Sequence, residues 1–226
     1  MKDISIDGKY DLSPAEPAFL RFFDINDIDD IEAYRLVDIE PEVRFWMDED
    51  PIETDIEIIK HLGNVSEFLI MAICSKKDLR IIGWLQFTYD DPYHITQLNE
   101  AENRFRYCTD IIEISYARHT KSSDVTKGFI SSAVRQACYI FNESFKHAFP
   151  GKKLMLTAYT DVENLPSERV LEKSFFTKVD EVFYYEDEPD LKDKLWVLDT
   201  EKLDNNFSDV SKILLPESVI KQFVGS

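Results

Sequence analysis

The sequence is poor in cysteine and glycine, and these shortages exclude several kinds of site. Its 226 residues include only 3 cysteines and 6 glycines. Cys74, Cys108 and Cys138 are odd in number and far apart, so reduced thiols in a cytoplasmic protein are expected instead of a disulfide framework or a zinc site. The 4 histidines lack ligand spacing, so no metal site is predicted. Glycine-based Walker, dinucleotide and nucleophile-elbow motifs are absent.

Long hydrophobic runs and an excess of positive charge are also missing. No stretch of about 18 apolar residues could cross a membrane, and the first residues lack the apolar core of a signal peptide. Asp and Glu number 44 against 26 Lys and Arg, which gives a net charge of -18. Such a surface repels nucleic acid and anionic lipid and attracts amines and basic peptides or proteins. A role of this acidity in solubility alone stays open.

What is present is the composition of a folded domain. Hydrophobic residues make up 44% of the chain and aromatic residues 13%, which suits one well-buried core. We predict a flexible arm over residues 1–17, a folded domain over 18–198 and a C-terminal extension over 199–226 with a short helix at 216–223.

Hydrophobic patterning predicts an α/β fold with a mixed sheet. Asp24 or Asn26 is expected to cap the first helix, and Thr54 the second. The polar connection 88–110, with a short helix at 97–105, suits either a binding loop or a decorative insertion. The expected strands are 18–23, 68–74, 80–87, 112–116, 153–159, 176–185 and 194–198, and the expected helices cover 28–35, 54–62, 125–145 and a segment that begins at Asn164.

The loop 119–128 is cationic within an acidic chain, because Arg118, Lys121, Lys127 and Arg135 outnumber Asp124. It leads into a long amphipathic helix, whose N-terminus offers free N–H groups and partial positive charge to a phosphate. An ordinary capped helix with solvated lysines is the alternative.

Three motifs follow one another in the chain. They are Glu113-Ile114-Ser115-Tyr116 in a strand, Lys127-Gly128-Phe129 at a helix start, and Asn164-x-x-Ser167 followed by Val170-Leu171-Glu172-Lys173. In this order they resemble the GNAT N-acetyltransferase superfamily, especially its ribosomal-protein-acetyltransferase-like branch. The resemblance spans about residues 18–198. It implies a mainly antiparallel twisted sheet of about seven strands flanked by about four helices.

The resemblance also implies a function. We expect an N-acetyltransferase that moves acetyl from acetyl-coenzyme A (acetyl-CoA) to a primary amine of a small molecule or basic peptide. Glu113 is the expected general base, and Tyr116 a candidate acid. The fourth and fifth strands should separate between 114–118 and 156–159, and Phe45, Trp46, Asp48 and Glu49 should face the acceptor. The implied cofactor-binding residues are Ala117, Thr126, Lys127, Gly128, Phe129, Ser131, Asn164 and Ser167.

The chain departs from the family pattern at several positions. Thr126 and Ile130 replace small residues of the phosphate loop, Leu171 replaces a tyrosine acid, and Phe175 replaces a glycine. A catalytically inactive binding or regulatory protein of the same fold therefore stays open, as does an interaction protein that uses its acidic surface. A homodimer is possible, and the identity of the acceptor is open.

Overall fold

The computed structural model describes residues 9–10, 17–47, 52, 54–89, 110–119, 128–179, 183–184, 192–198, 200, 203 and 214–225. The predicted α/β fold is confirmed. The described strands are β1 (Ala18–Phe22), β2 (Leu69–Ser75), β3 (Ile81–Tyr89), β4 (Asp110–Arg118), β5 (Leu154–Asp161), β6 (Phe176–Lys178), β7 (Phe183–Tyr184) and β8 (Lys192–Leu198). The described helices are α1 (Ile28–Asp38), α2 (Pro41–Met47), α3 (Asp55–Gly63), α5 (Phe129–Ala148), α6 (Leu165–Lys173) and α8 (Glu217–Val224).

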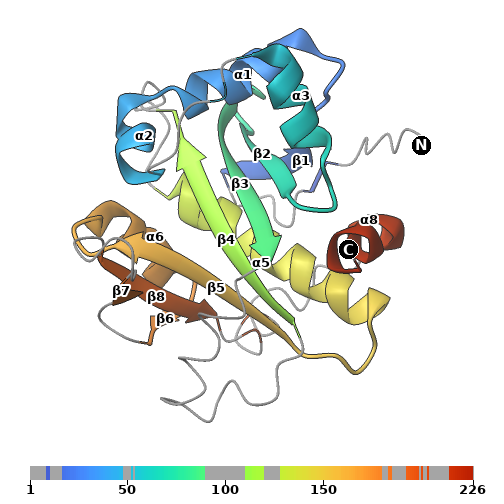
Figure 1. Ribbon diagram of the computed structural model, residues 1–226, viewed down its shortest axis with the longest axis vertical. Coiled ribbons are helices and arrows are strands. Elements are labelled where there is room, and N and C mark those ends of the chain that lie inside the picture. Colours follow the sequence, from blue (N-terminus) through green and yellow to red (C-terminus); the bar gives the residue numbers. More distant parts are fainter. Residues whose placement is uncertain are drawn as a thin grey trace.

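All these strands form one sheet in the order β1-β2-β3-β4-β5-β8-β6, and β7 also pairs with β8. Each pairing is antiparallel except that between β4 and β5, which is parallel. A parallel pair needs a long crossover, and α5 lies between these two strands in the chain and provides it. Figure 1 shows α5 running along the sheet beside β4 and β5.

Two cores lie on opposite faces of the sheet, because neighbouring strand residues point to opposite sides. On one face, alternate residues such as Met71, Phe87 and Ile112 pack with α5 and α8. On the other face, residues such as Ala72 and Trp84 pack with α1 and α3. Ala133 and Ala137 are fully buried in α5, and their small side chains let this helix approach the sheet closely.

Two helix starts show how far local sequence determines the caps. Thr54 caps α3 as predicted, and it forms a reciprocal capping box with Glu57. The prediction for α1 was wrong, because Asp27 rather than Asp24 or Asn26 accepts a hydrogen bond from the Asp29 N–H. Asp24 instead accepts the N–H of Asn26 in the preceding turn.

The helix α2 was not predicted from the sequence. It has only seven residues, and Arg44 within it holds Asp38 at the end of α1, with the Arg44 Nη2 2.6 Å from Asp38 Oδ1. The second Asp38 oxygen accepts the N–H of Ile52 at 3.0 Å. This buried carboxylate therefore connects the ends of α1, α2 and the segment that leads to α3.

The C-terminal helix is confirmed as α8, where Val219, Ile220 and Phe223 are fully buried. Ser144 of α5 accepts the Leu215 N–H at 2.8 Å, and the Tyr89 hydroxyl donates to the Val224 carbonyl at 2.8 Å. No helix in the described part of the chain is long and apolar enough to cross a membrane. The expected helix at 97–105 lies outside the described residues, as does the expected arm except for 9–10 and 17.

Candidate active site

The strands β4 and β5 separate halfway along their length. Their parallel pairing begins with Asp110 opposite Leu154 and ends with Glu113 opposite Thr157. Beyond this point β4 pairs only with β3, while β5 pairs with β8. Figure 1 shows the two strands forming a V that opens toward α2 and α6. The predicted separation is thus confirmed, and it begins at Ile114 and Ala158.

Beyond Glu113, the backbone of β4 presents polar groups to the space between β4 and β5. His119 donates its N–H to Ile82 of β3 at 3.0 Å. Backbone groups alternate in direction along a strand, so those of Ala117 also point to β3, whereas those of Tyr116 and Arg118 point away from it, toward β5. The Tyr116 N–H is therefore placed to donate to a group held between the diverging strands.

Glu113 occupies the last paired position before the separation. It lies opposite Thr88 of β3 and Thr157 of β5, so these three side chains share one row on the face opposite α5. Glu113 is half-buried, whereas Thr157 is fully buried, with its Oγ1 3.5 Å from the Ile112 carbonyl oxygen. Thr157 had no distinctive pattern in the sequence, because only strand pairing places it beside Glu113.

Tyr116 lies on the other face of β4 and contacts α6. Its hydroxyl donates a hydrogen bond to the Ser167 carbonyl oxygen at 3.1 Å. Burial raises the pKa of Tyr116 well above its ordinary value, and the side chain of Ser167, as distinct from its carbonyl, opposes this shift in part. The side chain is therefore a neutral hydroxyl at physiological pH, and it connects β4 to the first turn of α6.

Gly128 caps the N-terminus of α5 in a left-handed conformation with φ of 105°. A Cβ at this position would meet no atom within 4 Å, so the backbone here is open. The Ser131 hydroxyl donates to the Gly128 carbonyl at 3.1 Å, and Phe129 is buried in the core between α5 and the sheet. Gly128 is thus exposed, whereas Phe129 and Ser131 of the first turn are buried, and Thr126 and Lys127 lie outside the described residues.

The N-terminus of α6 is capped by Asn164, whose predicted contact with a cofactor stays a prediction. Its Oδ1 accepts the Ser167 N–H at 3.2 Å. Lys194 of β8 contacts the chain on both sides of this cap. Its Nζ donates to the Val162 carbonyl at 2.9 Å and forms an ion pair with Glu168 in the first turn of α6. The structure thus brings Asn164, Ser167 and Tyr116 together beside the separated strands.

Ala117 and Arg135 have other surroundings than the sequence suggested. The side chain of Ala117 packs in the core below α1, and its backbone points to β3. The role of Ala117 in cofactor binding stays a prediction. The backbone groups of Tyr116 and Arg118 point toward β5 and are therefore better oriented than those of Ala117 to bind a group between the strands. Arg135 donates to the Lys173 carbonyl at the end of α6, so it contacts that helix rather than the start of α5.

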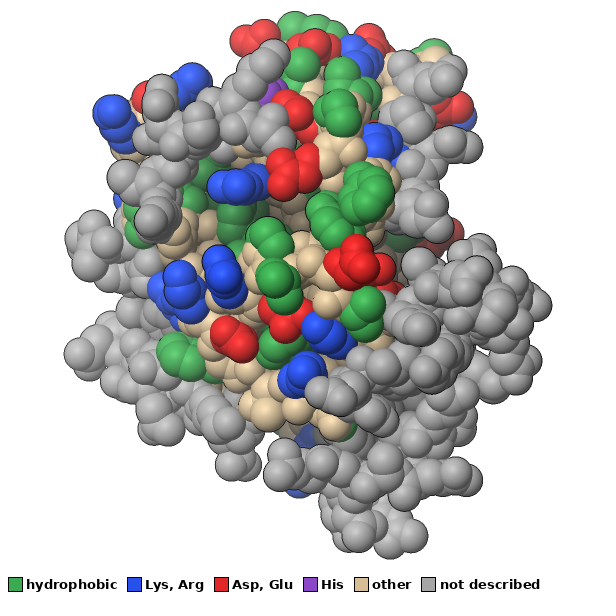
Figure 2. Space-filling model, turned by 90° about the vertical axis from the view of Figure 1, so that its left-hand side faces the viewer, with side chains coloured by type: hydrophobic (Ala, Val, Ile, Leu, Met, Phe, Trp, Pro, Cys, Tyr) green, Lys and Arg blue, Asp and Glu red, His purple; other side chains and the backbone are tan. Residues whose placement is uncertain are grey.

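The helix α2 places aromatic side chains at the open side of the V. Phe45 is 72% exposed, and its ring packs edge-on against Trp46 at 4.6 Å between centroids. His119, just after β4, lies 3.3 Å from Glu40 and so connects β4 to the start of α2. The face toward which the V opens carries acidic, basic and hydrophobic side chains intermingled (Figure 2). Asp48 and Glu49 lie outside the described residues.

A family model for the acetyltransferase (GNAT) domain matches residues 18–177. The chain belongs to the GNAT acetyltransferase family. The members of this family are transferases. The parallel pairing of β4 with β5 and the separation of the two strands are the features of this chain described above. Within the described residues, no three His, Cys, Asp or Glu side chains gather as a metal site.

Solved structures of GNAT enzymes share this fold at low sequence identity. A GNAT-family acetyltransferase from Bacillus anthracis has a TM-score of 0.57 and 17% identity, over 84% of this chain and 98% of that one. An acetyltransferase from Salmonella typhimurium that modifies the N-terminal serine of a 50S ribosomal subunit protein has a TM-score of 0.56 and 15% identity, over 84% and 98%. Spermidine N-acetyltransferase from Vibrio cholerae, in complex with CoA and spermine, has a TM-score of 0.57 and 12% identity, over 83% and 98%. A comparison with curated proteins gives no match.

Proposed function

We propose that this chain is an N-acetyltransferase that moves acetyl from acetyl-CoA to a primary amine of a cationic acceptor. The observation that carries the proposal is the end of β4–β5 pairing at Glu113 and Thr157, beside the N-termini of α5 and α6. The separating strands then offer backbone donors between them, a carboxylate on one face, and the start of α5 on the other. Acyl transfer to an amine uses each of these groups.

The residues present fit the cofactor. The diphosphate of acetyl-CoA needs N–H donors and positive potential, which the open backbone at Gly128 and the start of α5 supply. Ile130 does not fill this space, because its side chain packs against the core between α5 and the sheet. The Tyr116 N–H, directed toward β5, is placed to bind and orient an acyl carbonyl. When bound, acetyl-CoA supplies the acetyl group as an activated thioester.

Glu113 is the proposed proton acceptor. An ammonium group cannot attack a carbonyl, so the acceptor must lose a proton before transfer. Glu113 lies at the apex of the V on the face opposite α5, and it can accept this proton directly or through water. Leu171 replaces the tyrosine acid seen in some family members and is fully buried. Tyr116 is the nearest described phenol on β4, and its neutral hydroxyl is a proton donor rather than a base.

The acceptor surface is proposed to include α2. Phe45 offers exposed aromatic area on α2, with the half-buried Trp46 packed against it, and Leu165 of α6 is 54% exposed. Aromatic faces attract ammonium groups, and the net charge of -18 favours the approach of cations. These features support a cationic amine, and they do not distinguish a small molecule from a basic peptide.

Cofactor binding tests the proposal through two matched glycines. Gly128 and Gly151 both have positive φ and open Cβ positions, but Gly151 lies beyond the C-terminal end of α5. CoA at 100 times its Kd should raise the unfolding free energy by about 2.7 kcal/mol. We expect this shift in the wild type and in Gly151→Ala, and a smaller one in Gly128→Ala, measured by thermal melting and calorimetry.

Two outcomes would contradict the proposal. If millimolar CoA leaves the melting temperature unchanged, the chain does not use this cofactor. If CoA binds but no amine from a broad panel is acetylated, the inactive binding protein of the same fold is the correct description. Equal CoA affinity in both glycine variants would show that the diphosphate is held elsewhere.

A further inference from the structure

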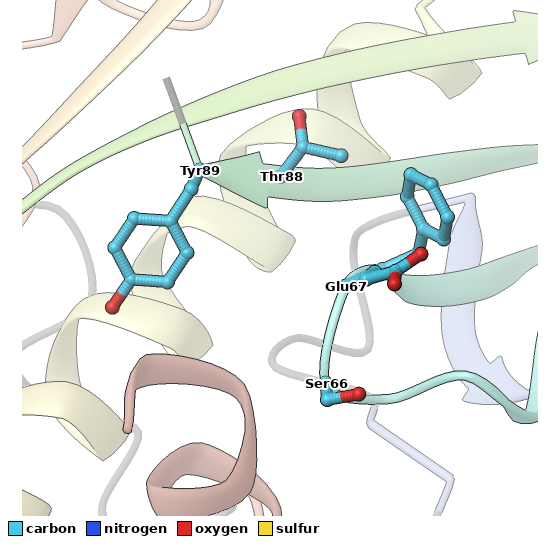
Figure 3. Close-up of a pocket in the computed structure, with 5 residues that line it drawn as sticks. Ser66, Glu67, Thr88 and Tyr89 are labelled. Carbon is cyan, nitrogen blue, oxygen red and sulfur yellow. The ribbon is translucent and has the colours of Figure 1, made fainter. Parts of the chain in front are cut away.

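A hollow lies at the end of β3, beside Thr88, the residue that pairs with Glu113. It has a volume of about 410 Å³ and is lined by Ser66, Glu67, Phe68, Thr88 and Tyr89. Figure 3 shows Ser66 and Glu67 on the turn before β2, and Thr88 and Tyr89 at the end of β3, with their side chains leaving the strand in opposite directions. This volume is within the range of small-molecule sites.

Strand register places one wall of this hollow in the same row of side chains as the proposed base. Leu69 pairs with Phe87, so Phe68 comes opposite Thr88, and Thr88 pairs with Glu113. Residues opposite one another in antiparallel strands point to the same face. Neighbouring strands lie about 4.8 Å apart, so the Cα of Phe68 lies roughly 10 Å from that of Glu113.

The lining has the chemistry of a cation site. Glu67 is exposed and places a carboxylate at the hollow, and Phe68 adds an aromatic ring on the face of Glu113, whereas the ring of Tyr89 lies on the other face of the sheet. A carboxylate with aromatic rings selects ammonium groups over anions and neutral groups. Burial raises the pKa of Tyr89 to about 12, with a smaller contribution from Asp110, so its hydroxyl is neutral at physiological pH.

The wall formed by Tyr89 is fixed by α8. The Tyr89 hydroxyl donates to the Val224 carbonyl, and its ring packs against Phe223 at 5.6 Å between centroids. Phe68 is held from the opposite side by His61 of α3, with ring centroids 4.6 Å apart. Each aromatic ring is thus held by a helix, Phe68 by α3 on one face of the sheet and Tyr89 by α8 on the other.

We propose that this hollow binds a second cationic group of the acceptor, about 10 Å from the amine that is acetylated. The acceptor is then an elongated amine, such as a linear diamine or polyamine, with its reacting nitrogen at Glu113 and its distal ammonium at Glu67. This inference rests on the proposed function, because it takes Glu113 as the base. The hollow contributes length and charge selectivity, while the groups at the V carry out the transfer.

The test compares linear α,ω-diamines of increasing length with monoamines of the same chain length. We expect the wild-type kcat/KM to peak at the diamine that spans about 10 Å and to exceed that of the matched monoamine. Glu67→Gln should lower kcat/KM for that diamine about threefold to fivefold, as for one exposed ion pair. The control Asp29→Asn removes an exposed carboxylate at the start of α1 and should keep the wild-type length profile.

Binding of the same diamines, measured by calorimetry with CoA present, separates the two proposals. Acetylation that ignores diamine length and is equal in Glu67→Gln would overturn the second cation site and leave the proposed function intact. Diamine binding that depends on Glu67 without any acetylation would support the site and overturn the catalytic proposal. Absence of both acetylation and Glu67-dependent binding would overturn both.

Discussion

The hydroxyl of Tyr116 on β4 and the backbone carbonyl of Ser167 on α6 form a hydrogen bond of 3.1 Å across the region where β4 and β5 have separated. The same Ser167 donates its N–H to Asn164 at the start of α6. This phenol therefore links the start of α6 to β4, in addition to the contacts that Lys194 makes with the same turn.

Tyr116→Phe removes this bond and leaves a carbonyl without its donor. We expect a loss of about 1–3 kcal/mol in the free energy of unfolding, and a KM for acetyl-CoA that rises more than kcat falls, because the helix start is displaced. Tyr10→Phe is the control, since Tyr10 is also buried but lies beside β1. A fall in kcat at constant KM would instead show that the Tyr116 hydroxyl takes part in the chemistry.

Glu113→Gln tests the proposed base. A general base typically contributes a factor of about 10²–10⁴, so kcat should fall by this order while CoA affinity is kept. Without the base, the rate follows the fraction of acceptor that is already neutral, and it should keep rising toward the acceptor's own pKa, about 10.4 for a lysine-like amine. An unchanged pH–rate profile would remove Glu113 from the mechanism.

Gly83→Ala tests the close approach of β3 and β4. A Cβ at Gly83 would lie 2.3 Å from the Ala117 carbonyl oxygen, and a backbone atom cannot move aside cheaply. We expect a loss of about 1–3 kcal/mol, as for overpacking in a core, measured by urea unfolding. Gly63→Ala, where the nearest atom is 4.0 Å away, should lose much less.

Phe175 has a positive φ of 70° at the position where the family has glycine. Its ring packs against the core between α5 and the sheet. This contact stabilises the left-handed conformation, which costs any residue other than glycine about 1–2 kcal/mol. Phe175→Gly and Phe175→Ala both remove the ring, but only glycine relieves the strain. The glycine variant should therefore be more stable than the alanine variant by about 1 kcal/mol in chemical denaturation. The reverse order would show that the strain is absent in solution.

The stability of the chain should fall in alkali, partly because of Tyr10. Burial raises the pKa of Tyr10 from 10.0 to about 12. A raised pKa in the folded state contributes stability below the unfolded pKa and loses it as the pH rises through the folded pKa, here from about 10 to about 12. Unfolding free energies across this window should fall less steeply in Tyr10→Phe than in the wild type.

The sequence was sufficient for most elements, because strand and helix periodicities are strong from β1 to α6. It failed for α2, where seven residues are too few for a pattern and the exposed Phe45 obscures the buried face. It also misassigned the cap of α1, since Asp24, Asn26 and Asp27 are equally good caps and tertiary contacts decide among them.

The candidate site was predictable only in part. Motif spacing singled out Glu113, Gly128 and Asn164, and their roles in a site stay predictions. It gave no signal for Thr157 or Glu67, because these join the site through strand register. Counting outward from the turn between β2 and β3 would have failed, because the register shifts by one residue between Ile73 and Cys74, and this shift brings Phe68 opposite Thr88. The direction of the Ala117 backbone depends on the pairing of β3 with β4, which local sequence does not determine.

The packing of α8 has a consequence for biosynthesis. Tyr89 and Val224 are hydrogen-bonded although 135 positions separate them, and Phe141 of α5 packs against Phe223. During synthesis the strands can therefore pair before this helix emerges from the ribosome. Until then, the aromatic rings of Tyr89 and Phe141, which α8 covers in the folded protein, are exposed to solvent. Chaperone dependence should accordingly be greatest for chains shortened just before Pro216, although all the groups around the V have already been synthesised.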